Sequence, residues 1–195
     1  MVRTKPARPR IAPLRPPFDP DTAEMLRRWM PPGAEAEPLA LFRTLAVHAQ
    51  LMSRMRPLGA GILGHGRVPA RDREIVIHRT CARAGAEYEW GVHAVAFGQA
   101  VGLTDAQIAA TAGAGGDDDA GAGWSEADAA LIAFADELHD TATVSDAAWS
   151  RLAARYDEAQ LVELLVIAGW YRTLAYVINA ARVALEPWGR RFPDL

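Results

Sequence analysis

The sequence predicts an all-α protein, a compact bundle of about eight helices. Apolar residues recur at intervals of three and four through most of the chain, a spacing that places them on one helix face. No segment of useful length shows the apolar–polar alternation of a strand. The chain has 195 residues, half of them hydrophobic and 23% charged, which is enough to bury a sizeable core.

The two ends of the chain are expected to lie outside one all-α domain spanning residues 21–185. Residues 1–20 hold six of the thirteen prolines, so they form an arm that cannot be helical and that wraps over a surface or a partner subunit. Residues 186–195 form a C-terminal tail.

The first helices are predicted from caps, breakers and periodicity. A helix opens at Asp21 as N-cap and stops at Pro31-Pro32-Gly33. A second apolar pattern covers residues 38–56, and the glycines from Gly59 to Gly66 predict a looser stretch after it.

The centre of the chain predicts two long helices joined by a sharp turn. The first runs from Pro69 to Ala84, with proline at its first turn, and Gly85 breaks it. The second runs from Ala86 to about Val101 and ends at Gly102.

Capping residues predict the remaining helices. Thr104 with Gln107 and Ser125 with Asp128 are capping boxes, and a flexible acidic, glycine-rich loop over residues 113–123 lies between them. Ser145 caps a short helix, and Asp157 opens the last long apolar helix.

Titratable residues gather on the two central helices. Glu74, His78 and Cys81 are spaced to share one face of the first helix, and Glu89 and His93 share a face of the second. The turn at Gly85 allows these faces to oppose each other, which brings the group together. Because charged groups are costly to bury, such a group is either an active site or a well-satisfied ionic cluster that pins two helices.

The catalytic interpretation assigns acid–base chemistry to His93, with Glu89 or Glu74 orienting the imidazole and stabilising its charged form. Such a pair suits proton abstraction next to a carbonyl, or proton delivery as carbon dioxide leaves. Neither reaction needs a cofactor, and we expect none. The same residues form two Glu/His pairs, but two-metal bundles use Glu-x-x-His spacing and more glutamates, so we expect no metal.

Aromatic and polar residues near this group are candidates for substrate binding. Trp90, Trp170 and Tyr171 would wall a pocket for a flat unsaturated or aromatic ligand, with core packing as the alternative. Cys81 is far from any helix N-terminus that would lower its pKa, so a peroxidatic role is disfavoured. The candidate substrate-binding residues are Tyr88, Trp90, Cys81, His78 and Tyr171.

Residues 40–185, most specifically 70–103, resemble the carboxymuconolactone decarboxylase and alkylhydroperoxidase D superfamily. Aligned on Glu74 and His93, the two cysteine positions of the peroxidase branch fall on Ala86 and Glu89. The Glu-Tyr-Glu-Trp-x-x-His segment is similar to the cysteine-free, decarboxylase-like branch, as is Asp136-Glu-Leu-His139, for which a packing or subunit-contact role is expected.

The resemblance implies an alkylhydroperoxidase D-like helical bundle, a functional glutamate and histidine, and homo-oligomers from dimers to hexamers. It favours a cofactor-independent small-molecule enzyme of lyase or isomerase type, decarboxylase-like. Two alternatives stay open: an alkylhydroperoxidase-like oxidoreductase, which the missing Cys-x-x-Cys pair disfavours, and a non-catalytic oligomeric binding protein. The substrate expected is a small unsaturated or aromatic acid or lactone.

Composition limits partners and compartment. The net charge is −3 with no dominant basic patch, so nucleic acid is not an expected partner. The N-terminus lacks the apolar core of a signal peptide, and no run approaches the roughly eighteen apolar residues of a membrane span. A cytoplasmic protein without membrane contact is therefore expected, and its alanine- and arginine-rich composition suggests a bacterial genome. The single cysteine excludes an intrachain disulfide.

Overall fold

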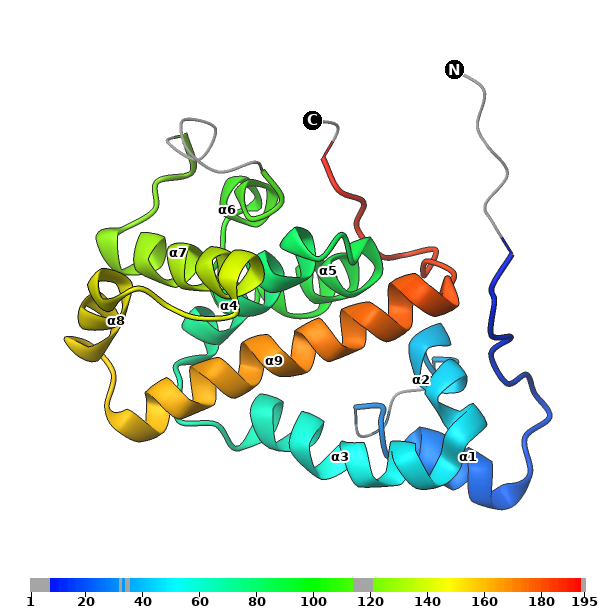
Figure 1. The fold of residues 1–195 in the computed structure, drawn as a ribbon. Coiled ribbons are helices and arrows are strands. Elements are labelled where there is room, and N and C mark those ends of the chain that lie inside the picture. The colour runs from blue at the N-terminus through cyan, green and yellow to red at the C-terminus, as the bar shows by residue number, and fades with distance from the viewer. Residues whose placement is uncertain (1–7, 32, 34–35, 114–120, 194–195) are drawn as a thin grey trace.

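The computed structural model describes residues 8–31, 33, 36–113 and 121–193, and it confirms the all-α prediction. Within these residues there is no strand (Figure 1). The elements are α1 (Pro20–Arg27), α2 (Ala40–Leu45), the 3₁₀ turn η1 (Ala46–His48), α3 (Ala49–Gly64), α4 (Ala70–Arg83), α5 (Glu87–His93), the π-helical turn η2 (Ala94–Gly98), α6 (Asp105–Ala110), α7 (Glu126–Thr141), α8 (Asp146–Ala153) and α9 (Glu158–Ala181).

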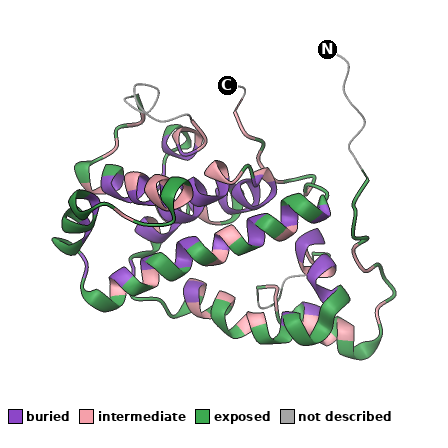
Figure 2. Cartoon of the chain, in the orientation of Figure 1, coloured by how far each residue is buried: buried purple, intermediate pink, exposed green. Residues whose placement is uncertain are grey.

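Helix α4 is the centre of the bundle. It packs mainly against α7, α9 and α5, and α9 crosses in front of it with α3 below (Figure 1). Every residue from Asp72 to Cys81 is buried, so the helix has no solvent-facing side over this stretch (Figure 2). The polar side chains of α4 must therefore find partners inside the protein.

Ion pairs at one constant sequence offset join α4 to α7. Arg71 pairs with Asp128, Arg79 with Asp136 and Arg83 with Asp140, and each pair is 57 residues apart. Because the number of the aspartate rises together with that of the arginine, the two helices run parallel. The middle pair is the most buried, because the Arg79 side chain is 1% exposed.

Arg79 satisfies several groups at once. Its Nε and Nη2 donate to the Asp136 carboxylate at 2.6 and 2.8 Å, and Nη1 donates to the carbonyls of Thr111 and Gly113 at 3.1 and 2.8 Å. The guanidinium thus ties α4 to α7 and to the end of α6. Asp136 has the packing role expected for it.

The predicted start of the first helix is corrected by two residues. Asp19, not Asp21, is the N-cap of α1: its carboxylate accepts from the amide of Thr22 at 3.0 Å. Pro20 occupies the first helical position, where its missing N–H costs no helical hydrogen bond.

The predicted loose stretch after residue 56 is also wrong. Helix α3 continues through Pro57 to Gly64, and a break divides the 38–56 pattern instead, at η1. A Cβ on Gly59 would lie 3.0 Å from the Trp170 ring, so this glycine permits close packing of α3 on α9 rather than ending a helix.

The predicted helix from Ala86 to about Val101 is corrected, because α5 ends at His93 and the π-helical turn η2 continues it only to Gly98. The glycines predicted to bound this segment do position the site. Gly85 has φ +63° between α4 and α5, and Gly102 has φ +84° after η2, conformations that glycine adopts without strain. The capping boxes of Thr104 and Ser125 form, Asp157 forms a third, and Ser145 caps α8. Of the predicted acidic loop, residues 114–120 lie outside the described residues.

The described parts of the arm and of the tail are hydrogen-bonded to the bundle. In the arm, Arg10 N donates to the Ala181 carbonyl at 2.8 Å, so the described part covers its own chain. In the tail, Arg190 N donates to the Gly91 carbonyl at 3.2 Å, and Phe192 N donates to the Glu87 carboxylate at 3.0 Å. A Cβ on Gly91 would lie 2.1 Å from the Arg190 carbonyl oxygen, so only glycine permits this crossing of α5.

One expectation about membrane spans needs correction. Helix α9 is, by length and composition, apolar enough to cross a membrane: it has 24 residues and a window of mean hydropathy 1.5. Half of that window is buried inside the bundle, which also fits the core helix of a soluble protein.

The Arg79–Asp136 pair generates a stability prediction. Arg79→Met should lower the free energy of unfolding by about 3 kcal/mol, because it leaves a carboxylate and two carbonyls without their donor. Arg83→Met should cost less, about 1 kcal/mol, because Arg83 is 28% exposed and pairs with the exposed Asp140, and its second contact, 3.3 Å from Asp136, leaves Arg79 bound to that carboxylate. Urea denaturation followed by circular dichroism measures both, and equal costs would contradict the assignment.

Candidate functional site

The structure brings Glu74 and His93 into direct contact at the centre of the protein. Oε2 of Glu74 accepts a hydrogen bond from Nδ1 of His93 at 2.8 Å. The Glu74 side chain is 0% exposed and that of His93 is 4% exposed. Glu74 is therefore the hydrogen-bonded partner of the imidazole, an assignment that residue spacing leaves open between two glutamates.

Two more charged groups extend this contact into a row of alternating charge. On one side, Nε of Arg73 lies 3.5 Å from Oε1 of Glu74. On the other side, Oε1 of Glu89 lies 3.6 Å from Nε2 of His93, an ion-pair distance that exceeds a hydrogen bond. With His93 protonated, the row contains two positive and two negative charges.

The row favours a protonated His93. Burial alone lowers the pKa of His93, but the charge and hydrogen bond of Glu74, followed by those of Glu89, raise it to about 9. Burial likewise raises the pKa of Glu74, yet His93 outweighs it and holds that pKa below its usual value. At neutral pH the site thus presents an imidazolium, which is an acid.

His78 has the opposite charge state. Its Nδ1 lies 2.7 Å from the Glu74 backbone carbonyl, which can only accept, so this nitrogen carries the proton. Burial lowers the pKa of His78 to about 4, which keeps the ring neutral. Its Nε2 is fully buried and has no hydrogen-bond partner among the described residues.

Aromatic rings enclose His93. The Tyr171 ring from α9 meets the imidazole edge-on at 5.0 Å between centroids, and Phe97 from η2 lies at 4.8 Å. The π-helical turn that carries Phe97 directly follows His93, and such turns recur at functional sites. Burial raises the pKa of Tyr171 well above its ordinary value, so its hydroxyl stays protonated.

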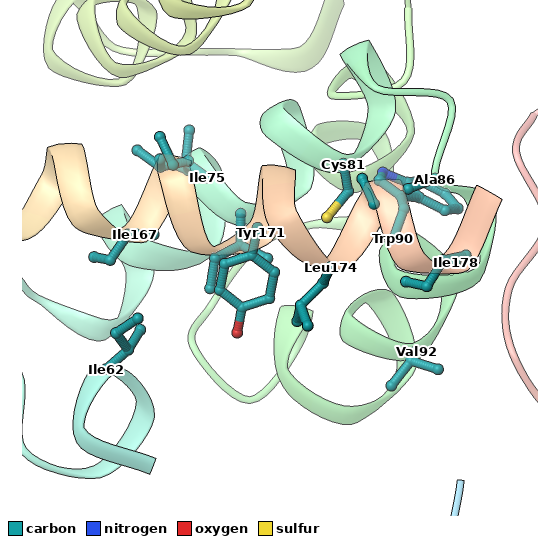
Figure 3. Close-up of a cluster of buried hydrophobic side chains, with 14 of the residues drawn as sticks. Ile62, Ile75, Cys81, Ala86, Trp90, Val92, Ile167, Tyr171, Leu174 and Ile178 are labelled. Carbon is teal, nitrogen blue, oxygen red and sulfur yellow. The ribbon is translucent and has the colours of Figure 1, made fainter. Parts of the chain in front are cut away.

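The remaining substrate-binding candidates are held in the packing around the site. Figure 3 shows Cys81, Trp90 and Leu174 in one apolar cluster. The Trp90 indole donates to Thr111 Oγ1 at 2.9 Å and is 0% exposed. Burial raises the pKa of the Cys81 thiol well above its ordinary value.

Tyr88 uses its hydroxyl to join distant segments. The hydroxyl donates to Oε1 of Glu186 at 2.7 Å and accepts from the amide of Leu41 at 3.1 Å. The same Glu186 oxygen accepts from the amide of Ala40. Tyr88 thus ties α5 to α2 and to the C-terminal tail.

The part of the chain that the structure describes contains no set of metal ligands. No group of three His, Cys, Asp or Glu side chains in those residues is arranged to hold a metal ion.

Sequence reasoning missed Arg73 and Glu186. Arg73 was detectable as a second charge beside Glu74 in a buried helix pattern. Its Nη1 donates to the carbonyl of Leu63 at 3.3 Å, so it also caps the end of α3. Glu186 lies 98 residues from Tyr88, and no local pattern announces such a contact.

Comparison with known proteins gives one family match. The family model described as the carboxymuconolactone decarboxylase family matches residues 49–136, which include the site residues from Arg73 to Phe97 but not Tyr171. The comparison with curated proteins gives no match.

Solved structures share the fold. An uncharacterized peroxidase-related protein from Silicibacter sp. TM1040 matches with a TM-score of 0.74 and 15% identity, covering 98% of this chain and 100% of the other. A cysteine-to-alanine variant of the debrominase Bmp8, in complex with 2,3,4-tribromopyrrole, matches with a TM-score of 0.72 and 18% identity, covering 91% and 92%. At these identities the likeness establishes the alkylhydroperoxidase D-like fold, as the sequence predicts.

The raised pKa of His93 predicts a pH dependence of stability. The folded protein holds a proton on His93 that the unfolded chain loses above its ordinary pKa of 6.5. This contribution is complete below pH 6.5 and is lost as the pH rises through about 9, by up to about 1.4 kcal/mol per pH unit.

Urea denaturation at intervals between pH 6 and 10, with His93→Gln as the matched variant, measures this contribution. In His93→Gln, the free energy of unfolding should be lower overall. It should lack the part of the decline above pH 6.5 that comes from the His93 proton. Parallel declines in the two proteins would contradict the assignment.

Proposed function

Because the chain belongs to the carboxymuconolactone decarboxylase superfamily, we propose that it is a small-molecule lyase that uses His93 as its general acid. The observation that carries the proposal is a buried imidazolium whose Nδ1 is held by Glu74. With that nitrogen occupied, the transferable proton is on Nε2, which faces Glu89, the less buried of the two carboxylates in the row.

The proposed step is the protonation of carbon during decarboxylation. The bond between the substrate carboxylate and its carbon breaks, and its electron pair stays on that carbon, delocalised into a conjugated carbonyl. The Nε2 proton then forms the new C–H bond, carbon dioxide leaves, and His93 becomes neutral. Glu74 stabilises the imidazolium before transfer and fixes the ring so that Nε2 faces the substrate.

The surroundings support a small conjugated substrate, such as an unsaturated or aromatic acid or lactone. The rings of Tyr171 and Phe97 provide flat apolar walls at the imidazole. The debrominase of the same fold holds a small flat ring, 2,3,4-tribromopyrrole. The proposed step needs neither a cofactor nor a metal. An isomerase would use the same acid to protonate an enolate.

A thiol-dependent oxidoreductase is the weaker candidate. Peroxide reduction needs a thiolate, and the only cysteine of the chain is buried, with a thiol pKa well above its ordinary value. The two positions that carry cysteines in the peroxidase branch hold Ala86 and Glu89 here.

The exposed face of α9 supports self-association. Val162, Leu165, Val166 and Tyr176 are exposed along one side of this helix, at fractions between 37% and 61%. Apolar side chains gathered along one face mark an interaction surface. We propose that a second copy of the chain covers them.

Substrate screening tests the catalytic proposal. Small keto acids, unsaturated lactones and phenolic acids are screened by thermal shift, and hits are assayed for release of carbon dioxide. Cys81→Ala should keep activity within about threefold, whereas His93→Gln should lose 100-fold or more, as expected when a general acid is removed. Circular dichroism must show that each variant is folded at the assay temperature.

Loss of turnover in Cys81→Ala, with retention in His93→Gln, would contradict the proposal and favour thiol chemistry. If ligands bind but neither protein converts them, the non-catalytic binding alternative is favoured.

Self-association is tested by analytical ultracentrifugation. The wild type should sediment as a dimer or larger assembly, and Val162→Glu with Val166→Glu should reduce that mass, because two charges would be buried in the contact. Ala147→Glu, at an exposed position on α8, should leave the mass unchanged. A monomeric wild type at all concentrations would contradict the proposal.

A further inference from the structure

The two glutamates beside His93 are not equivalent. Glu74 is 0% exposed and binds Nδ1 at 2.8 Å, whereas the Glu89 side chain is 8% exposed and lies 3.6 Å from Nε2. Side-chain exposure rises from 0% at Glu74 through 4% at His93 to 8% at Glu89, and it is 9% for Arg73 at the other end of the row. Of the two carboxylates, Glu89 is the one closer to solvent.

The proposed function requires protons to travel along this row. Each turnover leaves His93 neutral, and a buried imidazole must regain a proton from solvent before the next substrate reacts. Nδ1 keeps its proton in the hydrogen bond to Glu74, so the proton must return to Nε2.

The other groups beside Glu74 and His93 offer no route for that proton. Arg73 cannot lose a proton under working conditions, and its Nη1 donates to the end of α3. His78 is 0% exposed and donates its only proton to the Glu74 backbone carbonyl. The rings of Tyr171 and Phe97 also pack against the imidazole.

We propose that Glu89 is the proton shuttle of the site, carrying protons between solvent and Nε2 of His93 while Glu74 keeps the ring oriented. In the cycle, the Glu89 carboxylate takes a proton from water or a buffer acid. It passes that proton to Nε2 of neutral His93 and returns to its charged form. The net change is one solvent proton consumed for each C–H bond formed.

The distance between Glu89 and His93 suits this role. At 3.6 Å the two groups are not locked in a direct hydrogen bond, so a small movement or one bridging water connects them. A permanent short bond would hold the proton and keep Nε2 from the substrate. The four-residue spacing of Glu89 and His93 on one helix face keeps them within reach of each other.

The shuttle rests on the proposed function for its purpose, but it is testable without a substrate. Exchange of the His93 Nε2–H proton with water is measured by ¹⁵N-resolved NMR near neutral pH. Glu89→Gln should slow this exchange at least about tenfold, because the amide cannot relay a proton. The Nδ1–H proton, held by Glu74, is the internal control and should be little changed.

Two further measurements distinguish loss of proton relay from a structural effect of the Glu89→Gln substitution. Formate, a small carboxylate, should restore Nε2–H exchange in Glu89→Gln as its concentration rises and should have little effect on the wild type. Glu89→Asp keeps a carboxylate at greater distance and should give an intermediate rate.

Unchanged Nε2–H exchange in folded Glu89→Gln would overturn the shuttle, because solvent would then reach His93 directly. Slowed exchange that formate does not restore would also overturn it. If exchange is slowed in Glu89→Gln and formate restores it, the shuttle is supported even when no tested acid is decarboxylated. Failure of the proposed reaction can therefore be distinguished from failure of the shuttle.

Discussion

A carboxylate buried in the middle of a helix is the constraint on which the rest of the structure depends. Glu74 is fully buried on α4, and an uncompensated charge there would cost several kcal/mol. Its compensation comes from His93 on α5 and from Arg73 beside it. The turn at Gly85 and the close crossing of the tail at Gly91 fix α5 where it can supply that compensation.

The same constraint sets two histidines in opposite charge states. His93 is stabilised as an imidazolium by two carboxylates, whereas His78, whose ring proton binds a backbone carbonyl, stays neutral. Environments that push the pKa values of neighbouring groups apart are how active sites assign acid and base roles. Here the acid lies between the fully buried Glu74 and the less buried Glu89, and this geometry motivates both the lyase proposal and the shuttle.

Local signals made most of the fold predictable. The capping residues at Thr104, Ser125 and Asp157, and the positive-φ glycine at residue 85, act within a few residues and are visible in the sequence. The prediction failed at α3, because the role of Gly59 is set by Trp170, more than a hundred residues away. The proximity of Glu74, Glu89 and His93 was likewise visible from spacing, whereas the part of Arg73 was missed. The choice of Glu74 as the partner of His93 was not visible from spacing, because side-chain conformations decide it.

The most direct test of the account is the ¹⁵N NMR spectrum of the histidine side chains at pH 7.5. The account predicts that His93 is protonated on both ring nitrogens, and that His78 is neutral with its proton on Nδ1. A neutral His93 at this pH would contradict the buried imidazolium and, with it, the assignment of His93 as the general acid.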